Sequence, residues 1–113
     1  MLVRNEVQTM DILSAFRFND INEELKEYRN TPNALLLDVR DLDEYNEENI
    51  PGSINIPVEE IDKIENMHYD KETPIYVYCH SGQRAGLAVI QLWKMGYINA
   101  KNIGGITHYK KED

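Results

Sequence analysis

The only cysteine of this 113-residue chain, Cys79, is followed five positions later by an arginine, Arg84. Four β-prone residues precede the cysteine, a short polar segment with one glycine follows it, and apolar residues then recur at helical spacing. This pattern predicts a strand, a tight loop and a helix. The first N–H groups of such a helix have no intrahelical acceptors, so together with the loop N–H groups they can form a cradle for an anion.

A thiol at the rim of this cradle is favoured as the thiolate by the helix N-terminus and by the guanidinium of Arg84. The thiolate is the nucleophilic form of cysteine, so the segment predicts a reactive sulfur on Cys79. The competing interpretation is a structural cysteine, because free cysteine is among the most buried residue types. The neighbouring residues favour function: Gly82 permits positive φ and close backbone approach, and Arg84 supplies a fixed fork of donors.

The segment Cys79-His80-Ser81-Gly82-Gln83-Arg84 resembles the active-site loop of the rhodanese (sulfurtransferase) family. Further segments resemble the family's first and C-terminal signatures, in the same order and at similar spacing: Leu36-Leu37-Asp38-Val39-Arg40, Glu44-Tyr45, Ile50-Pro51-Gly52-Ser53-Ile54-Asn55-Ile56-Pro57 and Asn102-Ile103-Gly104-Gly105-Ile106. The resemblance implies a sulfurtransferase, an enzyme in which the cysteine carries a persulfide between a sulfur donor and an acceptor.

The resemblance also implies roles for the residues of the loop. Cys79 is the expected catalytic nucleophile, and the expected substrate-binding residues are His80, Ser81, Gly82, Gln83 and Arg84. Asp38 and Arg40 follow an apolar run, and in open α/β sheets ligand sites gather beyond the carboxyl ends of the strands. We expect these two residues to support the loop as an ion pair or brace, because a carboxylate touching the sulfur would oppose thiolate formation.

The expected reaction moves a sulfane sulfur from thiosulfate, a polysulfide or a protein persulfide to a nucleophilic acceptor such as cyanide or a thiol, with a protein acceptor left open. Three alternatives remain: a non-catalytic rhodanese-like module that binds a protein partner, a persulfide carrier for one specific protein, and a cysteine-dependent phosphatase. Phosphatases place five residues between cysteine and arginine, whereas this chain has four, a tighter ring that suits a smaller substrate.

Composition limits the partners and the compartment. With 20 acidic and 12 basic residues the net charge is −8, which argues against binding nucleic acid. Nowhere do about 18 apolar residues follow one another, so we expect no membrane partner. A single cysteine forms no internal disulfide, which favours a reducing, cytoplasmic location. The three histidines, His68, His80 and His108, lack metal-ligand spacing, so we expect neither metal nor cofactor.

The remaining patterns predict one α/β domain: a rhodanese-like fold with a mostly parallel central sheet and helices on both faces. We expect residues 1–11 to be a partly ordered lead-in and residues 12–113 to be the domain. Within it we expect an edge strand in 12–18, helices over 20–29, 42–46, 58–64 and 85–95, strands over 34–39, 53–56, 75–79 and 100–103, and a tight turn at 104–105. Trp93 should lie in the core.

Overall fold

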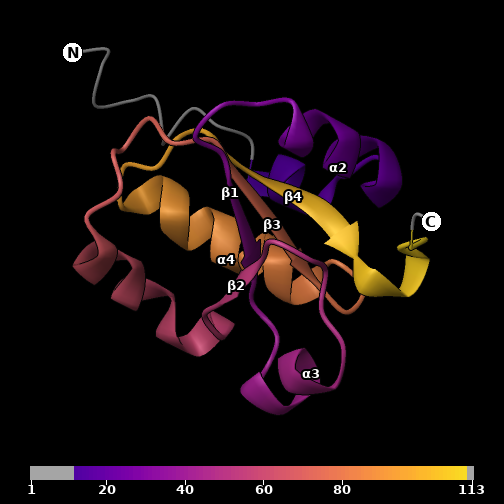
Figure 1. Cartoon of the computed structure of the whole chain (residues 1–113). Coiled ribbons are helices and arrows are strands. Elements are labelled where there is room, and N and C mark those ends of the chain that lie inside the picture. The colour runs from indigo at the N-terminus through magenta and orange to yellow at the C-terminus, as the bar shows by residue number, and fades with distance from the viewer. Residues whose placement is uncertain (1–11, 112–113) are drawn as a thin grey trace.

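The computed structural model describes residues 12–111, so the predicted lead-in over residues 1–11 and the last two residues lie outside the described part of the chain. Four strands form one sheet in the order β2-β1-β3-β4 (Figure 1), and each of the three pairings between neighbours is parallel. The strands are β1 (Leu35–Asp38), β2 (Ile54–Asn55), β3 (Ile75–Cys79) and β4 (Ala100–Gly105). The predicted parallel α/β sheet is therefore confirmed.

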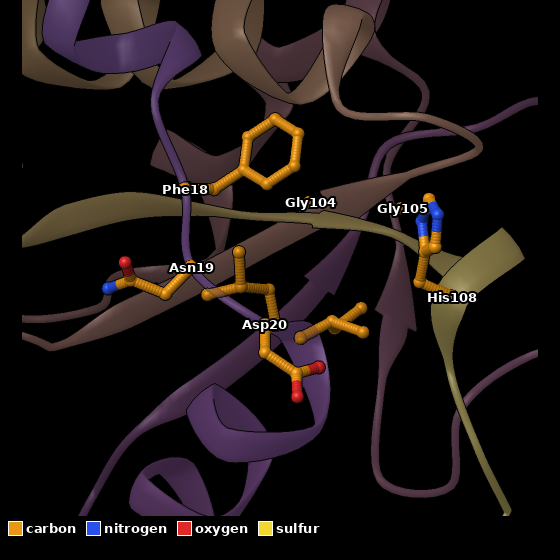
Figure 2. A pocket seen from close by; sticks show the side chains of 8 residues that line it. Phe18, Asn19, Asp20, Gly104, Gly105 and His108 are labelled. Carbon is orange, nitrogen blue, oxygen red and sulfur yellow. The ribbon is translucent and has the colours of Figure 1, made fainter.

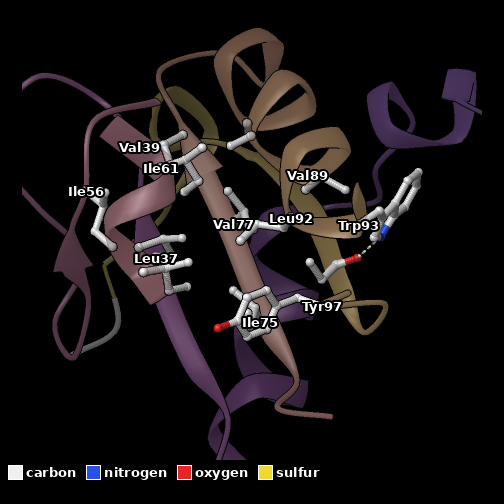
Figure 3. Close-up of a cluster of buried hydrophobic side chains, with 14 of the residues drawn as sticks. Leu37, Val39, Ile56, Ile61, Ile75, Val77, Val89, Leu92, Trp93 and Tyr97 are labelled. Carbon is white, nitrogen blue, oxygen red and sulfur yellow. Dashed lines mark hydrogen bonds between the residues drawn. The ribbon is translucent and has the colours of Figure 1, made fainter. Parts of the chain in front are cut away.

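Helices cover both faces of this sheet, and the side chains of β1 and β3 alternate between two separate apolar clusters, one on each face. The helical elements are η2 (Ile12–Phe16), α2 (Ile21–Arg29), α3 (Leu42–Glu47), η3 (Val58–Met67), α4 (Gln83–Lys94) and η4 (Ile106–His108), where η marks a 3-10 helix. On one face Leu36, Tyr76 and Tyr78 pack against α2. On the other face Leu37 and Val77 pack against α4 and η3 (Figure 3).

The larger cluster contains the only tryptophan of the chain. Trp93, near the end of α4, is 7% exposed, and its indole N–H donates to the backbone carbonyl of Ala100 at 3.0 Å (Figure 3). The predicted core position of this residue is confirmed. The helix ends at Lys94, and Gly96 follows with φ of 101°, the left-handed conformation typical of a residue after a helix C-terminus.

Two predictions about local structure are wrong. Residues 12–18 form no edge strand; Ile12–Phe16 is a 3-10 helix, and this segment packs Phe16 against Gly86 and Phe18 against Gly82. Glycines 104 and 105 do not make a tight turn, because they continue β4, where the pairing with β3 shifts by one residue. Such an irregularity adds an unpaired residue to one strand, which bends the strand locally.

The carboxyl ends of β1 and β3 meet at one edge of the sheet, since their pairing ends with Asp38 opposite Tyr78. The chain leaves β1 through α3 and leaves β3 through the loop that leads to α4 (Figure 1). The topology therefore brings α3 and the cysteine loop together, although 40 residues separate Glu44 from Arg84 along the chain. Within residues 12–111, no helix has the length and apolar character that spanning a bilayer requires.

Candidate active site

Cys79 is the last residue of β3, and the loop after it curls around its sulfur. The backbone N–H of Gly82 donates to Sγ at 3.0 Å, and that of Ala85, in the first turn of α4, donates at 3.3 Å. The residue is only 1% exposed, so the sulfur lies at the floor of the loop. Two N–H donors and a helix N-terminus directed at one sulfur are suited to stabilise negative charge on it.

The five predicted substrate-binding residues follow Cys79 in one loop and differ in burial. His80, Ser81 and Gln83 are exposed at the rim, whereas Gly82 is buried, and Arg84 is partly exposed. Gly82 has φ of 101°, a conformation that residues with a Cβ rarely adopt. A Cβ at this position would also lie 2.5 Å from the Phe18 ring, so the tight turn requires glycine for two reasons.

The side chain of Arg84 is held by a carboxylate from α3. Its two terminal nitrogens donate to the two oxygens of Glu44 at 2.7 and 3.0 Å, a bidentate pair with both side chains about one third exposed. Glu44 also accepts the backbone N–H of Asp41 at 2.9 Å. The hydrogen bond from Arg84 lowers the pKa of Glu44 to about 2, and hydrogen bonding and charge from Glu44 raise the pKa of Arg84, to which the charge of Cys79 adds.

Asp38 and Arg40 form a second, buried pair beyond the end of β1. Nε of Arg40 lies 3.1 Å from both carboxylate oxygens of Asp38, and Nη2 donates to one of them at 2.7 Å and to the carbonyl of Glu48 at 2.6 Å. Burial by itself lowers the pKa of Arg40, but hydrogen bonding and charge from Asp38 outweigh it, so the pKa is raised. The pair ties β1 to the segment after α3.

Asn102, which the sequence analysis did not single out as a site residue, supports the loop from β4. Its side-chain amide donates at 2.9 Å to the carbonyls of both Gly82 and Ala15, and its side-chain oxygen accepts the N–H of Gly104 at 2.8 Å. The residue is buried, so these three bonds satisfy a polar group that would otherwise be costly to bury. Asn102 thereby fixes the cysteine loop to η2 and to the sheet.

The end of β4 also contacts the loop directly. A Cβ on Gly105 would collide with the carbonyl oxygen of His80 and lie 2.5 Å from Cα of Ser81, so the two backbones approach as closely as only glycine allows. Thr107 donates both its N–H, at 3.3 Å, and its hydroxyl, at 3.2 Å, to the carbonyl of His80. The sequence signal for this contact is the Gly-Gly pair, which we interpreted as a turn.

A shallow hollow of about 280 Å³ lies on the other side of these glycines. Figure 2 shows it between the start of α2 and the end of β4, with Phe18, Asp20 and His108 around it. Neither Cys79 nor Arg84 lines the hollow, and its walls are mainly apolar. It is therefore separate from the cysteine loop.

Glu44 is the other residue at the site that the sequence analysis did not place there. It entered that analysis only as part of a family signature and as a helix-capping residue. The signal that would have found it is an acid in the first turn of a helix that follows directly after β1. Since β1 and β3 end at the same edge, such an acid is within reach of an arginine in the loop after β3.

Comparison with known proteins matches this chain to the family model described as "Rhodanese-like domain" over residues 22–112. It is 38% identical to the thiosulfate sulfurtransferase PspE of Escherichia coli over 62% of this chain and 68% of that protein. It is also 38% identical to the adenylyltransferase and sulfurtransferase uba4 of Ogataea parapolymorpha over 68% of this chain. The match spans only 20% of uba4, so it concerns one part of that longer protein.

Among solved structures, a rhodanese with anions from E. coli superimposes with a TM-score of 0.64 at 34% sequence identity. The superposition covers 70% of this chain and 94% of that one. The family match includes β1, the cysteine loop and the end of β4, which are the segments that the geometry brings together at one edge of the sheet. This chain therefore belongs to the rhodanese-like domain family.

Proposed function

We propose that this chain is a rhodanese-type sulfurtransferase that transfers a sulfane sulfur through a persulfide on Cys79. The observation that carries the proposal is the pair of backbone N–H groups, from Gly82 and Ala85, that donate to Sγ. A persulfide places its negative charge one atom farther out, where the remaining loop N–H groups and Arg84 can stabilise it. The relatives PspE and uba4 are both named sulfurtransferases, which supports the same activity for this chain.

In the first step the Cys79 thiolate attacks the outer sulfur of the donor. A new S–S bond forms on Cys79 while the donor's own bond to that sulfur breaks, and the leaving group departs with the electron pair. In the second step a nucleophile such as cyanide or a thiolate attacks the outer sulfur of the persulfide. Its attack restores the Cys79 thiolate, so the cycle needs no oxidant, reductant or cofactor.

The acceptor is a small nucleophile or a thiol on another protein. The rim of exposed side chains, His80, Ser81 and Gln83, leaves the mouth of the loop open to either kind of acceptor. The similarity to the "Putative sulfur carrier protein YrkF" of Bacillus subtilis, 37% identical over 60% of this chain, supports the protein acceptor. The cytoplasmic location expected from the sequence stays a prediction.

Intact-protein mass spectrometry tests the covalent step. The purified protein is incubated with thiosulfate, and separately with inorganic polysulfide, beside the variant Cys79→Ser. We expect a gain of about 32 Da, one sulfur atom, that cyanide or dithiothreitol removes and that the serine variant lacks. Gln91→Ala is the control, because it changes an exposed polar side chain of α4 outside the cysteine loop and leaves the nucleophile in place.

The outcome that would overturn the proposal is the absence of an adduct with every donor while iodoacetamide still alkylates Cys79. A thiol that is accessible but accepts no sulfur would favour the protein-binding module. Hydrolysis of an aryl phosphate by the same preparation would instead favour the phosphatase, although only four residues lie between Cys79 and Arg84 in this chain.

A further inference from the structure

Arg84, the residue expected to hold an anionic sulfur donor, already holds an anion of the protein itself. Both terminal nitrogens of its guanidinium donate to Glu44, whose Oε1 is fixed a second time by the N–H of Asp41. A guanidinium that makes a bidentate bond with a carboxylate presents little net charge to a third group. Arg84 therefore attracts a further anion less strongly than an unpaired arginine in the same loop would.

No other fixed cation of the loop compensates for this neutralisation. Between Cys79 and Arg84 the chain has only histidine, serine, glycine and glutamine, and the nearby Arg40 is committed to Asp38 and the carbonyl of Glu48. A dianion that approaches Cys79 therefore meets no unpaired cationic side chain among these residues, and the whole chain carries a net charge of −8.

We propose that Glu44 is a selectivity residue that disfavours dianionic sulfur donors such as thiosulfate and favours donors of lower charge, namely thiol persulfides. This inference rests on the proposed sulfurtransferase function and names the class of donor. Thiosulfate has either to displace Glu44 from Arg84 or to bind beside it against like-charge repulsion. A thiol persulfide with an uncharged organic group carries at most one negative charge, so both obstacles are weaker for it than for thiosulfate.

The two donors differ in charge throughout the step. Thiosulfate, S–SO₃²⁻, loses its outer sulfur to the Cys79 thiolate to give Cys79–S–S⁻ and sulfite, SO₃²⁻, which takes the electron pair of the broken S–S bond. A persulfide, R–S–SH, reacts with the same thiolate to give Cys79–S–SH and R–S⁻. The reacting groups carry a total charge of −3 in the first reaction and −1 in the second. A carboxylate at the rim therefore raises the free energy of the first reaction's transition state more than that of the second.

Glu44 carries a negative charge near neutral pH. The hydrogen bond from Arg84 is the main cause of the lowered pKa of Glu44, about 2, so the carboxylate stays ionised near neutral pH. The side chain is also one third exposed, which places it in contact with the solvent from which a donor arrives. The carboxylate therefore remains available to pair with Arg84 near neutral pH.

The test measures kcat/KM for thiosulfate and for 2-hydroxyethyl persulfide, whose organic group is uncharged, in the wild type, in Glu44→Gln and in Glu47→Gln. Glu47 is an exposed glutamate on the same helix, so its replacement removes one charge from α3 without touching Arg84. We expect Glu44→Gln to raise the thiosulfate-to-persulfide ratio on the order of tenfold, and Glu47→Gln to change it less than about twofold. The ratio cancels any loss of loop geometry that affects both donors.

A third variant, Glu44→Asp, separates charge from geometry, because it keeps the carboxylate but shortens its reach to Arg84. We expect it to disfavour thiosulfate as the wild type does. A second readout uses sulfate, a dianion that transfers no sulfur, as a probe that protects Cys79 from iodoacetamide. The sulfate concentration that halves the alkylation rate should fall about tenfold in Glu44→Gln and stay unchanged in Glu47→Gln.

The two hypotheses fail in different ways. If the persulfide adduct forms on Cys79 with both donors but Glu44→Gln leaves the donor ratio unchanged or lowers it, the selectivity role is wrong and the sulfurtransferase proposal stands. If neither donor modifies Cys79 in any of the variants, the sulfurtransferase proposal itself fails. Sulfate protection that is equal in wild type and Glu44→Gln would also contradict the selectivity role.

Discussion

Two arginine–carboxylate pairs lie at the same edge of the sheet, and they differ in burial. The Asp38–Arg40 pair is almost fully buried, with side-chain exposures of 0% and 5%, and joins residues two apart in the chain. The Glu44–Arg84 pair has side-chain exposures of 33% and 32% and joins residues 40 apart. The first pair forms where β1 ends, and the second joins α3 to the cysteine loop.

This difference in burial separates a structural pair from one that a ligand can exchange. Breaking a buried pair leaves a charge without solvent or partner, so the fold itself opposes any exchange. A pair that is one third exposed contributes little to stability, because water and salt screen it. A competing anion can therefore replace its carboxylate at a modest cost in free energy. The same two chemical groups therefore form a structural pair in one place and an exchangeable pair in the other.

Asp38→Asn should have the largest effect on stability. The amide keeps the size of the side chain but leaves Arg40 buried without its counter-charge, so we expect a loss of about 3–5 kcal/mol in the free energy of unfolding. Urea denaturation followed by circular dichroism measures it, with the exposed Asp43→Asn as control. A loss below about 1 kcal/mol would mean that burial does not distinguish the two pairs.

Glu44→Gln should change the free energy of unfolding by less than about 1 kcal/mol, because the pair it breaks is partly solvated. The same variant should shift the donor preference. The buried pair should therefore affect mainly stability, and the partly exposed pair mainly donor selectivity. The measurement is urea denaturation beside the kinetics described above. A destabilisation as large as that of Asp38→Asn would assign Glu44 to the fold instead of the substrate.

Salt should distinguish the pairs by their coupling energies. Double-mutant cycles with Arg84→Met and Glu44→Gln, and with Arg40→Met and Asp38→Asn, give the pairwise energy at low and high ionic strength. Between about 0.05 and 1 M NaCl we expect the rim coupling to fall by a few tenths of a kcal/mol and the buried coupling to hold. Equal salt sensitivity in both cycles would remove the distinction.

Acid should abolish the small contribution of Glu44 within a defined window. Its pKa is lowered from 4.5 to about 2 in the folded chain, so the stabilisation is present above pH 4.5 and is lost as the pH falls toward 2. The difference in melting temperature between wild type and Glu44→Gln should therefore shrink over that interval. A difference that stays constant from pH 6 to about 2 would contradict the ion pair as its source.

Much of the architecture could be predicted from sequence because its signals are local. The apolar runs before Asp38 and Cys79 indicate strands buried on both faces, and the structure has β1 and β3 there. Capping patterns place the starts of α2 and α3 within a residue or two. The cysteine loop is a contiguous segment, so the residues that surround Sγ can be named before any tertiary contact is known.

The features that were missed depend on residues far apart in the chain. Glu44 reaches Arg84 across 40 residues, and Asn102 reaches Ala15 across 87. Gly105 has an extended backbone that any residue could adopt. Glycine is needed there because a side chain would collide with the backbone of His80 and Ser81, and no local sequence pattern indicates this contact. Residues 12–16 likewise form a 3-10 helix because their aromatic neighbours pack on distant glycines of α4 and the loop.

The position of Trp93 has a practical consequence for all of these measurements. Trp93 lies ten positions after Gln83, the first residue of α4, which corresponds to a distance on the order of 15 Å along the helix. The indole ring is packed in the core beside Ala100. Its fluorescence should thus report whether the core is intact, largely independently of what is attached to the sulfur. One optical signal can therefore follow unfolding both of the free thiol and of the proposed persulfide, and the difference between the two gives the effect of the added sulfur on stability.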